Sequence, residues 1–307
     1  MREAVELRRA LAQRGLTVAS WVPDASTGRS ADLSVRPARL LEDDRLTWHA
    51  VGPAEPWSEP VAFLDGIQHL ETVAYAGATP LFIAEIAAAV RERHERRLVT
   101  ALVERRVLAL GRPSALAAAA AALGELHPVE LPDDADSHPL IDRRAAAEAV
   151  DRARGDLEVA VGSRWRATGT AWLVLDGSLA ESPAWAEDPR MVGVMKSHAT
   201  LPFSGADLER YLHLPPGQRS SLFAPASRRL APVRSWGLRL WPWEGKDLFH
   251  GLVRVEVAPV NGTPARADEL SRWLLAERAP VSTPDPRWDR LLYGIHGVGE
   301  YLRAGKA

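Results

Sequence analysis

Cysteine is absent from all 307 residues of the sequence. This absence excludes disulfide bonds, thiolate nucleophiles and zinc sites built on cysteine, and it suits a protein of the reducing cytoplasm. Long apolar runs are also absent, since none approaches the ~20 residues that a membrane-spanning helix needs. Residues 1–15 alternate charged and apolar side chains and lack the apolar core of a signal peptide. We therefore expect a cytoplasmic protein with no membrane association.

An excess of positive charge is missing too, because 38 lysine and arginine residues face 40 aspartate and glutamate residues, for a net charge of −2. The chain therefore has no broad positive field to attract nucleic acid, and any DNA contact must come from local basic groups. The stretch "WGLRLWPWEGK" offers Arg239 and Lys246 as such groups, interleaved with tryptophans. These tryptophans could stack on bases, but core or interface packing is favoured because an alternating strand buries one face anyway.

Several catalytic signatures are missing. The chain has no GxxxxGK[ST] loop, so it does not hydrolyse ATP through a P-loop and any motor must be a partner. The histidines show no HExxH spacing, which gives a zinc hydrolase little support. Ser178 lies outside a GxSxG turn, which argues against an α/β-hydrolase. Carboxylates remain the best candidates for chemistry.

The order of the apolar patterns indicates an α/β fold. Strand-like runs at 60–66, 70–77 and 80–90 precede helix-like segments at 114–126 and 140–167, and a further strand-like run follows at 171–177. This order is that of a ribonuclease-H-like mixed sheet, in which an antiparallel meander is joined by parallel strands and flanked by helices. We expect residues 1–59 to form an N-terminal helical and irregular extension and residues 60–307 to form the main domain.

Two of the strand-like runs end in Leu-Asp-Gly, at Asp65 and at Asp176. Asp-Gly is a common hairpin turn, and at Asp65 a hairpin stays possible because a second apolar run follows. If the first and fourth strands are parallel neighbours, however, the two aspartates lie side by side. A pair of carboxylates held in this way is suited to Mg²⁺ or Mn²⁺, which prefer hard oxygen ligands and assist phosphodiester hydrolysis.

The segments "LVLDGSL", "VGVMK" and "YGIHGVGEYL" resemble the NurA nuclease family. The resemblance covers the chain from about residue 60 to its C-terminus. It implies a manganese- or magnesium-dependent nuclease domain that resects DNA from the 5′ end, in DNA repair or phage defence. It also implies a homodimer that works with a hexameric HerA-type ATPase. The alternative is a non-catalytic, NurA-like scaffold that docks on such an ATPase.

The resemblance also implies roles for individual residues. Asp65 and Asp176 correspond to metal ligands, Lys196 to a group that faces the scissile phosphate, and His296 to a histidine of the terminal helix. The third acid is Glu158 or Glu148, because both lie on approximately one face of the predicted helix before "LVLDGSL". The chain departs from the family at Ile67, where a serine is usual, and at Trp288, where a tyrosine is usual. Neither departure removes a carboxylate.

Overall fold

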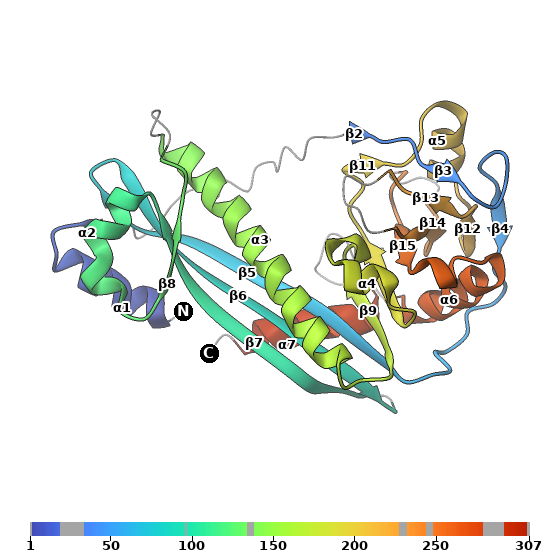
Figure 1. Cartoon of the computed structure of the whole chain (residues 1–307), viewed down its shortest axis with the longest axis horizontal. Helices are drawn as coiled ribbons and strands as arrows, with labels where there is room; N and C mark the ends of the chain where they lie inside the picture. The colour runs from blue at the N-terminus through green and yellow to red at the C-terminus, as the bar shows by residue number, and fades with distance from the viewer. Residues whose placement is uncertain are drawn as a thin grey trace.

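The computed structural model describes residues 2–18, 34–95, 97–133, 138–226, 232–243, 248–278 and 292–305. In this part of the chain, three long strands form an extended sheet with one long helix across one face and a shorter helix on the other, and further short strands and helices lie at both ends (Figure 1). The helices are α1 (Arg2–Ala12), α2 (Pro113–Leu123), α3 (Pro139–Arg166), α4 (Pro183–Glu187), α5 (Gly205–Leu212), α6 (Pro264–Glu277) and α7 (Tyr293–Ala304), with short 3-10 turns η1 (Leu179–Glu181) and η2 (Pro259–Asn261).

The strands fall into a long group and a short group. The long strands are β5 (Val61–Ala76), β6 (Thr79–His94) and β7 (Arg97–Gly111). The short strands are β1 (Thr17–Val18), β2 (Ser34–Val35), β3 (Arg39–Leu40), β4 (Trp48–Ala50), β8 (His127–Glu130), β9 (Trp172–Asp176), β10 (Met191–Met195), β11 (Thr200–Leu201), β12 (Gln218–Ser220), β13 (Phe223–Ala224), β14 (Arg234–Arg239) and β15 (Leu252–Val257).

The main sheet is mixed, as the sequence predicts. Among the described strands its order is β3-β13-β14-β15-β10-β9-β5-β6-β7-β8, and β1, β4 and β12 pair beside this path. Strands β5, β6 and β7 form the antiparallel meander, and β9 returns after α3 to pair parallel with β5. Parallel pairing then continues from β9 to β10. The ribonuclease-H-like fold class, including the N-terminal helix, is therefore confirmed.

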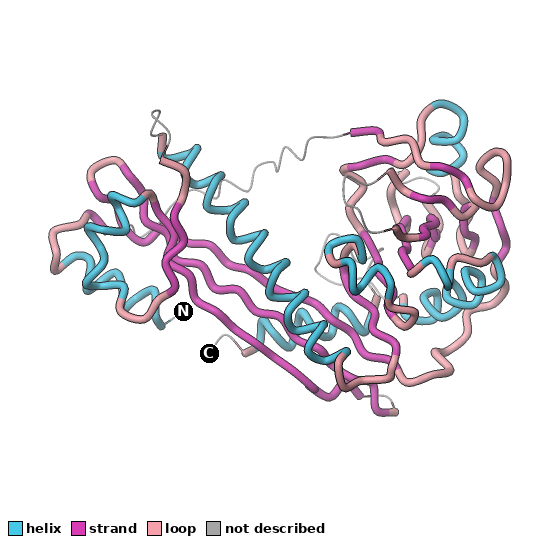
Figure 2. Tube along the Cα trace, in the orientation of Figure 1, coloured by secondary structure: helices cyan, strands magenta, loops and turns pink. Residues whose placement is uncertain are grey.

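One detail of the meander differs from the prediction. The runs at 60–66 and 70–77 are not separate strands but parts of the single 16-residue strand β5, which Figure 2 shows as one continuous tube. Asp65 pairs with Ala89 and Gly66 with Ala88 of β6, so no hairpin forms at this Asp-Gly. The reason is that β6 supplies a continuous antiparallel partner of matching length, and its backbone hydrogen bonds extend the strand through the glycine.

The core lies on both faces of the sheet, because successive side chains of a strand point to opposite sides. On β5, Phe63 packs into the cluster that includes Ile295 and Val298 of α7. The next residue, Leu64, packs into the cluster that includes Leu157 of α3. Helices α7 and α3 therefore cover opposite faces of the same strand.

Most tryptophans of the described residues fill this core. Trp172 and Trp273 are almost fully buried, and their ring centroids lie 5.9 Å apart in an edge-to-face arrangement that also involves Trp57. Trp236, from the stretch considered for base stacking, is completely buried. Core packing, the interpretation favoured from the sequence, is therefore confirmed for these side chains.

The N-terminal segment contributes to both ends of the molecule. Helix α1 contacts α2, and β1 pairs with the far end of β5. Farther along, β2 pairs with β11, β3 with β13, and β4 with β12. The division at residue 59 stays a prediction. In the described part of the chain, no helix combines the length and the apolar character needed to cross a bilayer.

Candidate functional site

Asp65 and Asp176 lie at neighbouring positions of parallel strands. The last paired residues of β5 and β9 are Leu64 and Leu175, so each aspartate is one residue beyond this pair. Strand β9 ends at Asp176, whereas β5 continues. The next strand, β10, pairs Val194 with Asp176. The two carboxylates predicted from the Leu-Asp-Gly motifs are thus brought together at one edge of the parallel part of the sheet.

Asp65 is the most strongly perturbed of these acids. Desolvation raises its pKa to about 7, and the negative charge of Asp176 adds to the increase. Lys196 and Arg154 oppose the shift, as does the Gly66 backbone N–H, which donates to Asp65 Oδ1 at 2.9 Å. A carboxyl group surrounded in this way binds a proton or a cation near neutral pH, because either one removes the cost of an unpaired buried charge.

Glu158 reaches the same site from α3. A Cβ atom at Gly66 would lie only 2.1 Å from Glu158 Oε1, so the glycine leaves the space that this side chain occupies. Burial raises the pKa of Glu158 to about 7; Arg154 opposes this shift, and the charges of Asp65 and Asp176 add to it. The sequence leaves the third acid open between Glu148 and Glu158. Of these two, Glu158 lies beside the aspartates.

Arg154 is a member of the site that the sequence analysis did not identify. Its Nη1 donates to Glu158, and its Nε donates to Gln68 Oε1 at 2.9 Å. The spacing to Glu158 is four residues on one helix, which is a recognisable ion-pair signal. This signal is common on solvated helices. Only the contact with Gln68 of β5 distinguishes Arg154 from a surface residue.

Lys196 follows β10 directly and lies against the aspartate pair. Its Nζ donates to Asp176 Oδ2 at 2.8 Å, and its side chain is 7% exposed. Its charge also lowers the pKa of Asp65. The lysine is therefore a buried cation of the acidic site and not a solvent-facing strand end.

Helix α7 closes the site from the other face of the sheet. A Cβ at Gly299 would lie 2.8 Å from Asp65 Oδ2, and one at Gly294 would lie 2.4 Å from the Phe63 ring, so glycines allow the helix to lie directly on β5. His296 is one turn before Gly299 and is partly exposed. In the described structure its imidazole has no hydrogen bond or ion pair.

Two other predicted residues, Glu148 and Arg239, are not brought to the site. Glu148 is 56% exposed and pairs with Arg144 at 3.0 Å on the surface of α3, so it is the outlying glutamate. Arg239 is fully buried, and its guanidinium donates to four backbone carbonyls, including Leu214 O at 3.0 Å. Its predicted contact with DNA is therefore wrong, because no face of the guanidinium reaches solvent. Lys246 lies outside the described residues.

A second acidic group consists of Glu42, Asp43 and His49. Within the described ranges it is the one set of three possible ligands whose atoms all lie within 4.8 Å of one another. Arg219 is 1% exposed and donates to both Glu42 oxygens, at 2.7 and 2.9 Å. Burial of Glu42 raises the pKa of this carboxyl group, but the hydrogen bonds and charge of Arg219 outweigh that effect, so the pKa is lowered. This group is therefore an ion-pair network in which arginine supplies the positive charge.

Comparison with known proteins supports the assignment of the fold. No protein-family profile matches the sequence, and no curated protein is similar to it. The crystal structure of the NurA nuclease from Sulfolobus solfataricus is similar over 83% of this chain and 81% of that one, with a TM-score of 0.53 and 10% sequence identity. The catalytic domain of human Endonuclease V aligns over 97% of this chain and 95% of its own, at 14% identity and a TM-score of 0.36, which is too low to establish a common fold.

The architecture and site first define an α/β protein with a ribonuclease-H-like mixed sheet and an acidic cluster at the edge of its parallel strands. More particularly, the chain has a NurA-like fold. This agrees with the resemblance read from "LVLDGSL" and "VGVMK".

Proposed function

We propose that this protein is a metal-dependent DNA nuclease whose ligands are Asp65, Asp176 and Glu158. The observation that carries the proposal is the convergence of three acids from β5, β9 and α3, two of them with the pKa raised to about 7 by burial and mutual repulsion. Such an arrangement is costly for a structural ion pair but useful where a cation is bound, because the cation removes both penalties. The NurA-like fold supports the same proposal.

The donor set fits Mg²⁺ or Mn²⁺. All three ligands are carboxylates, the hard donors that these ions prefer. Gly66 and Gly299 leave room around Glu158 and Asp65 that a methyl group would fill. The three acids are more widely spaced than the Glu42 group, and Arg154 and Lys196 are held against two of them. When bound, a divalent ion would polarise water and the scissile phosphate.

The chain's own cations have separate roles in this proposal. Lys196, now bound to Asp176, is the group best placed to donate to the scissile phosphate. Arg154 holds Glu158 in place through a contact that also includes Gln68. His296 lies on the same helix as Gly299, one turn away, and we assign it a proton-handling role near Asp65.

The family resemblance extends the proposal to partners. We propose 5′-end resection with a HerA-type hexameric ATPase in DNA repair or phage defence, and a cytoplasmic location.

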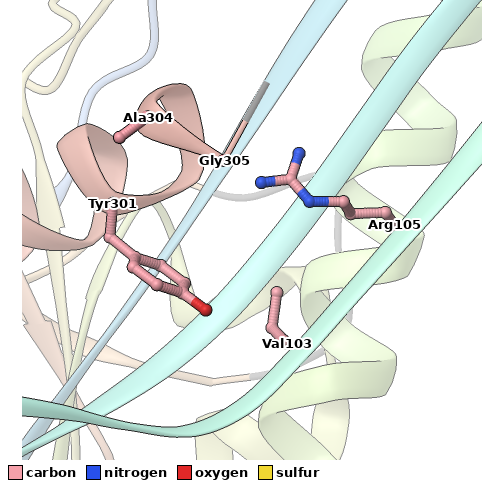
Figure 3. A pocket seen from close by; sticks show the side chains of 5 residues that line it. All are labelled: Val103, Arg105, Tyr301, Ala304 and Gly305. Carbon is pink, nitrogen blue, oxygen red and sulfur yellow. The ribbon is translucent and has the colours of Figure 1, made fainter. Parts of the chain in front are cut away.

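We also propose a homodimer. Val99 and Val103 of β7 are 50% and 40% exposed, and β8 pairs with β7 only from Leu108 onward. Beside this open edge is a hollow of about 670 Å³ between β7 and α7 (Figure 3). An edge of this kind, which has exposed valines and no strand partner among the described residues, is suited to pairing with a second copy.

The test is cleavage of end-labelled DNA by the purified protein with Mn²⁺, Mg²⁺ or EDTA. We expect cleavage with a divalent ion, none with EDTA, and losses of at least about a hundredfold in Asp65→Asn, Asp176→Asn and Glu158→Gln. Glu148→Gln is the matched control, since it removes an exposed carboxylate from the same helix. Full activity in the three site variants would contradict the assignment. A well-folded wild type with no metal-dependent cleavage would favour the non-catalytic scaffold instead.

A further inference from the structure

A separate cavity of about 200 Å³ lies next to the candidate site. Its wall includes Ser178, two residues after Asp176, and Ser197, the residue after Lys196. Arg254 and Glu256 of β15 also line it. These positions place the cavity at the ends of the same strands that carry the acidic site.

Arg254 of β15 has one donor without a partner among the described residues. Its Nη2 donates to Glu256 Oε1 at 3.1 Å and contacts the sulfur of Met195. Its Nε is buried and, among the described residues, has no hydrogen-bond partner. Leaving a buried donor of a charged group unpaired is destabilising, because the group has lost its hydrogen bonds to water. The described residues therefore leave this N–H available to an acceptor such as a bound anion.

Glu256 lies beside Arg254, and both of its carboxylate oxygens already accept hydrogen bonds from within the protein. It is 1% exposed, and Oε2 accepts from the Ser178 hydroxyl at 2.7 Å and from the Leu179 N–H at 3.1 Å. Oε1 accepts from Arg254. The carboxylate thus orients Arg254 and the Ser178 turn, and Arg254 lines the cavity beside it.

A second arginine lines the same cavity. Arg36 follows β2, which pairs with β11 beside the Lys196 loop. Within the described part of the chain, its guanidinium makes no hydrogen bond or ion pair. Arg36 and Arg254 together outweigh the single charge of Glu256, so the lining has a net positive charge. The exposed Ser197 hydroxyl adds a neutral donor.

We propose that this cavity is a phosphate-binding subsite formed by Arg36 and Arg254. Guanidinium groups bind phosphate oxygens through paired, charge-assisted hydrogen bonds. The cavity is smaller than the ~300–1,000 Å³ that encloses a drug-sized ligand, which suits one phosphate group with part of its sugar. Resting on the proposed nuclease function, we identify the ligand as a phosphate of the DNA strand near the scissile bond, either a terminal monoester or an internal diester.

The test measures DNA binding in EDTA, so that it does not depend on cleavage. Single-stranded oligonucleotides labelled at the 3′ end, with either a 5′-phosphate or a 5′-hydroxyl, are titrated and followed by fluorescence anisotropy. We expect Arg36→Gln and Arg254→Gln each to weaken binding by about fivefold to tenfold. Arg39→Gln is the control, because it makes the same charge change at an exposed residue that does not line this cavity.

The two oligonucleotides identify the source of the phosphate. Losses confined to the 5′-phosphorylated strand support a terminal monoester, and equal losses with both strands support an internal diester. Wild-type affinity for both strands in Arg36→Gln and in folded Arg254→Gln would overturn the proposal. If Arg254→Gln unfolds, Arg36→Gln decides alone, since the Arg36 guanidinium makes no hydrogen bond or ion pair with the described residues. Failure of the proposed catalytic site would appear separately, as full cleavage activity in Asp65→Asn.

Discussion

Asp65 and Asp176 become neighbours because β5 and β9 run parallel and stay paired through Leu64 and Leu175. Strand β9 then ends, which opens a space beside the strand that continues. Gly177, with a φ of +145°, turns the chain away at this point in a conformation that favours glycine. The sheet thereby holds two carboxylates on a rigid support where the shorter strand ends.

The first prediction concerns stability and pH in the absence of metal. Because burial and Asp176 raise the folded-state pKa of Asp65 from 3.8 to about 7, the folded protein binds this proton more tightly than the unfolded chain. The resulting stability is complete below about pH 4 and is lost as the pH rises through 7. We expect Asp65→Asn to be more stable than wild type at pH 8 by about 1–3 kcal/mol, but not at pH 4, in urea denaturation with EDTA. Equal stability at pH 8 would contradict the assigned environment.

The second prediction concerns metal binding. Protons and metal compete for Asp65 and Glu158, whose pKa values are both raised to about 7. Mn²⁺ should therefore raise the melting temperature more at pH 8 than at pH 6, since ligand binding stabilises the folded state in proportion to occupancy. Glu148→Gln should keep this response, and Glu158→Gln should lose most of it. A response that is the same at both pH values, or intact in Glu158→Gln, counts against the site.

Sequence reasoning reached the strand order and the aspartate pair because both depend on local patterns. Apolar runs and Asp-Gly steps are visible without a structure, and a crossover between parallel strands has few solutions. The continuity of β5 through Gly66 was not visible, because a glycine after aspartate has the same local signature in a turn and in a paired strand. The pairing with β6 decides between them, and that pairing is a tertiary contact.

Residue roles depended on contacts that the sequence does not reveal. Glu148 and Glu158 share a helix face only approximately, and the gap above Gly66 is what selects Glu158. The sequence predicts a DNA contact for Arg239 because this basic residue is interleaved with tryptophans that could stack on bases. In the fold it fills a pocket of backbone carbonyls, an environment formed by segments distant in sequence.

The third prediction tests the close contacts around the site. Gly66→Ala places a methyl group 2.1 Å from Glu158 Oε1, so the glutamate has to move away from the aspartates. We expect nuclease activity to fall by at least about tenfold, because a misplaced ligand weakens metal binding. Gly155→Ala is the control, since nothing lies within 4 Å of its Cβ position in α3 and alanine favours helix by roughly 0.5–1 kcal/mol. It should raise the melting temperature and keep activity.

The fourth prediction follows from the burial of Arg239. Arg239→Met removes the donor to four carbonyls, and a buried polar group left unsatisfied costs about 1–3 kcal/mol. We expect a lower urea midpoint with unchanged DNA affinity under conditions where the variant stays folded. A stable variant with weakened DNA binding would restore the role first expected from the sequence.

The fifth prediction concerns the dependence of DNA affinity on salt. With a net charge of −2, the isolated protein engages phosphates only through local groups, of which Arg36, Arg254 and Lys196 are the described candidates. Three contacts to single-stranded DNA imply a slope of log affinity against log salt of about −2, since each contributes roughly −0.7. Arg36→Gln should make this slope shallower by about 0.7, the contribution of one contact, while Arg39→Gln should leave the slope unchanged.

The same weak attraction explains why a partner ATPase would matter. A ring that holds the DNA end beside the nuclease raises its local concentration without adding any contact to the nuclease itself. We therefore expect slow cleavage by the protein alone and marked stimulation by a HerA-type ATPase, with the salt sensitivity of cleavage reduced in the complex. Nanomolar DNA binding by the purified chain at physiological salt, unchanged when the ATPase is added, would show that the charge-based account of its affinity is wrong.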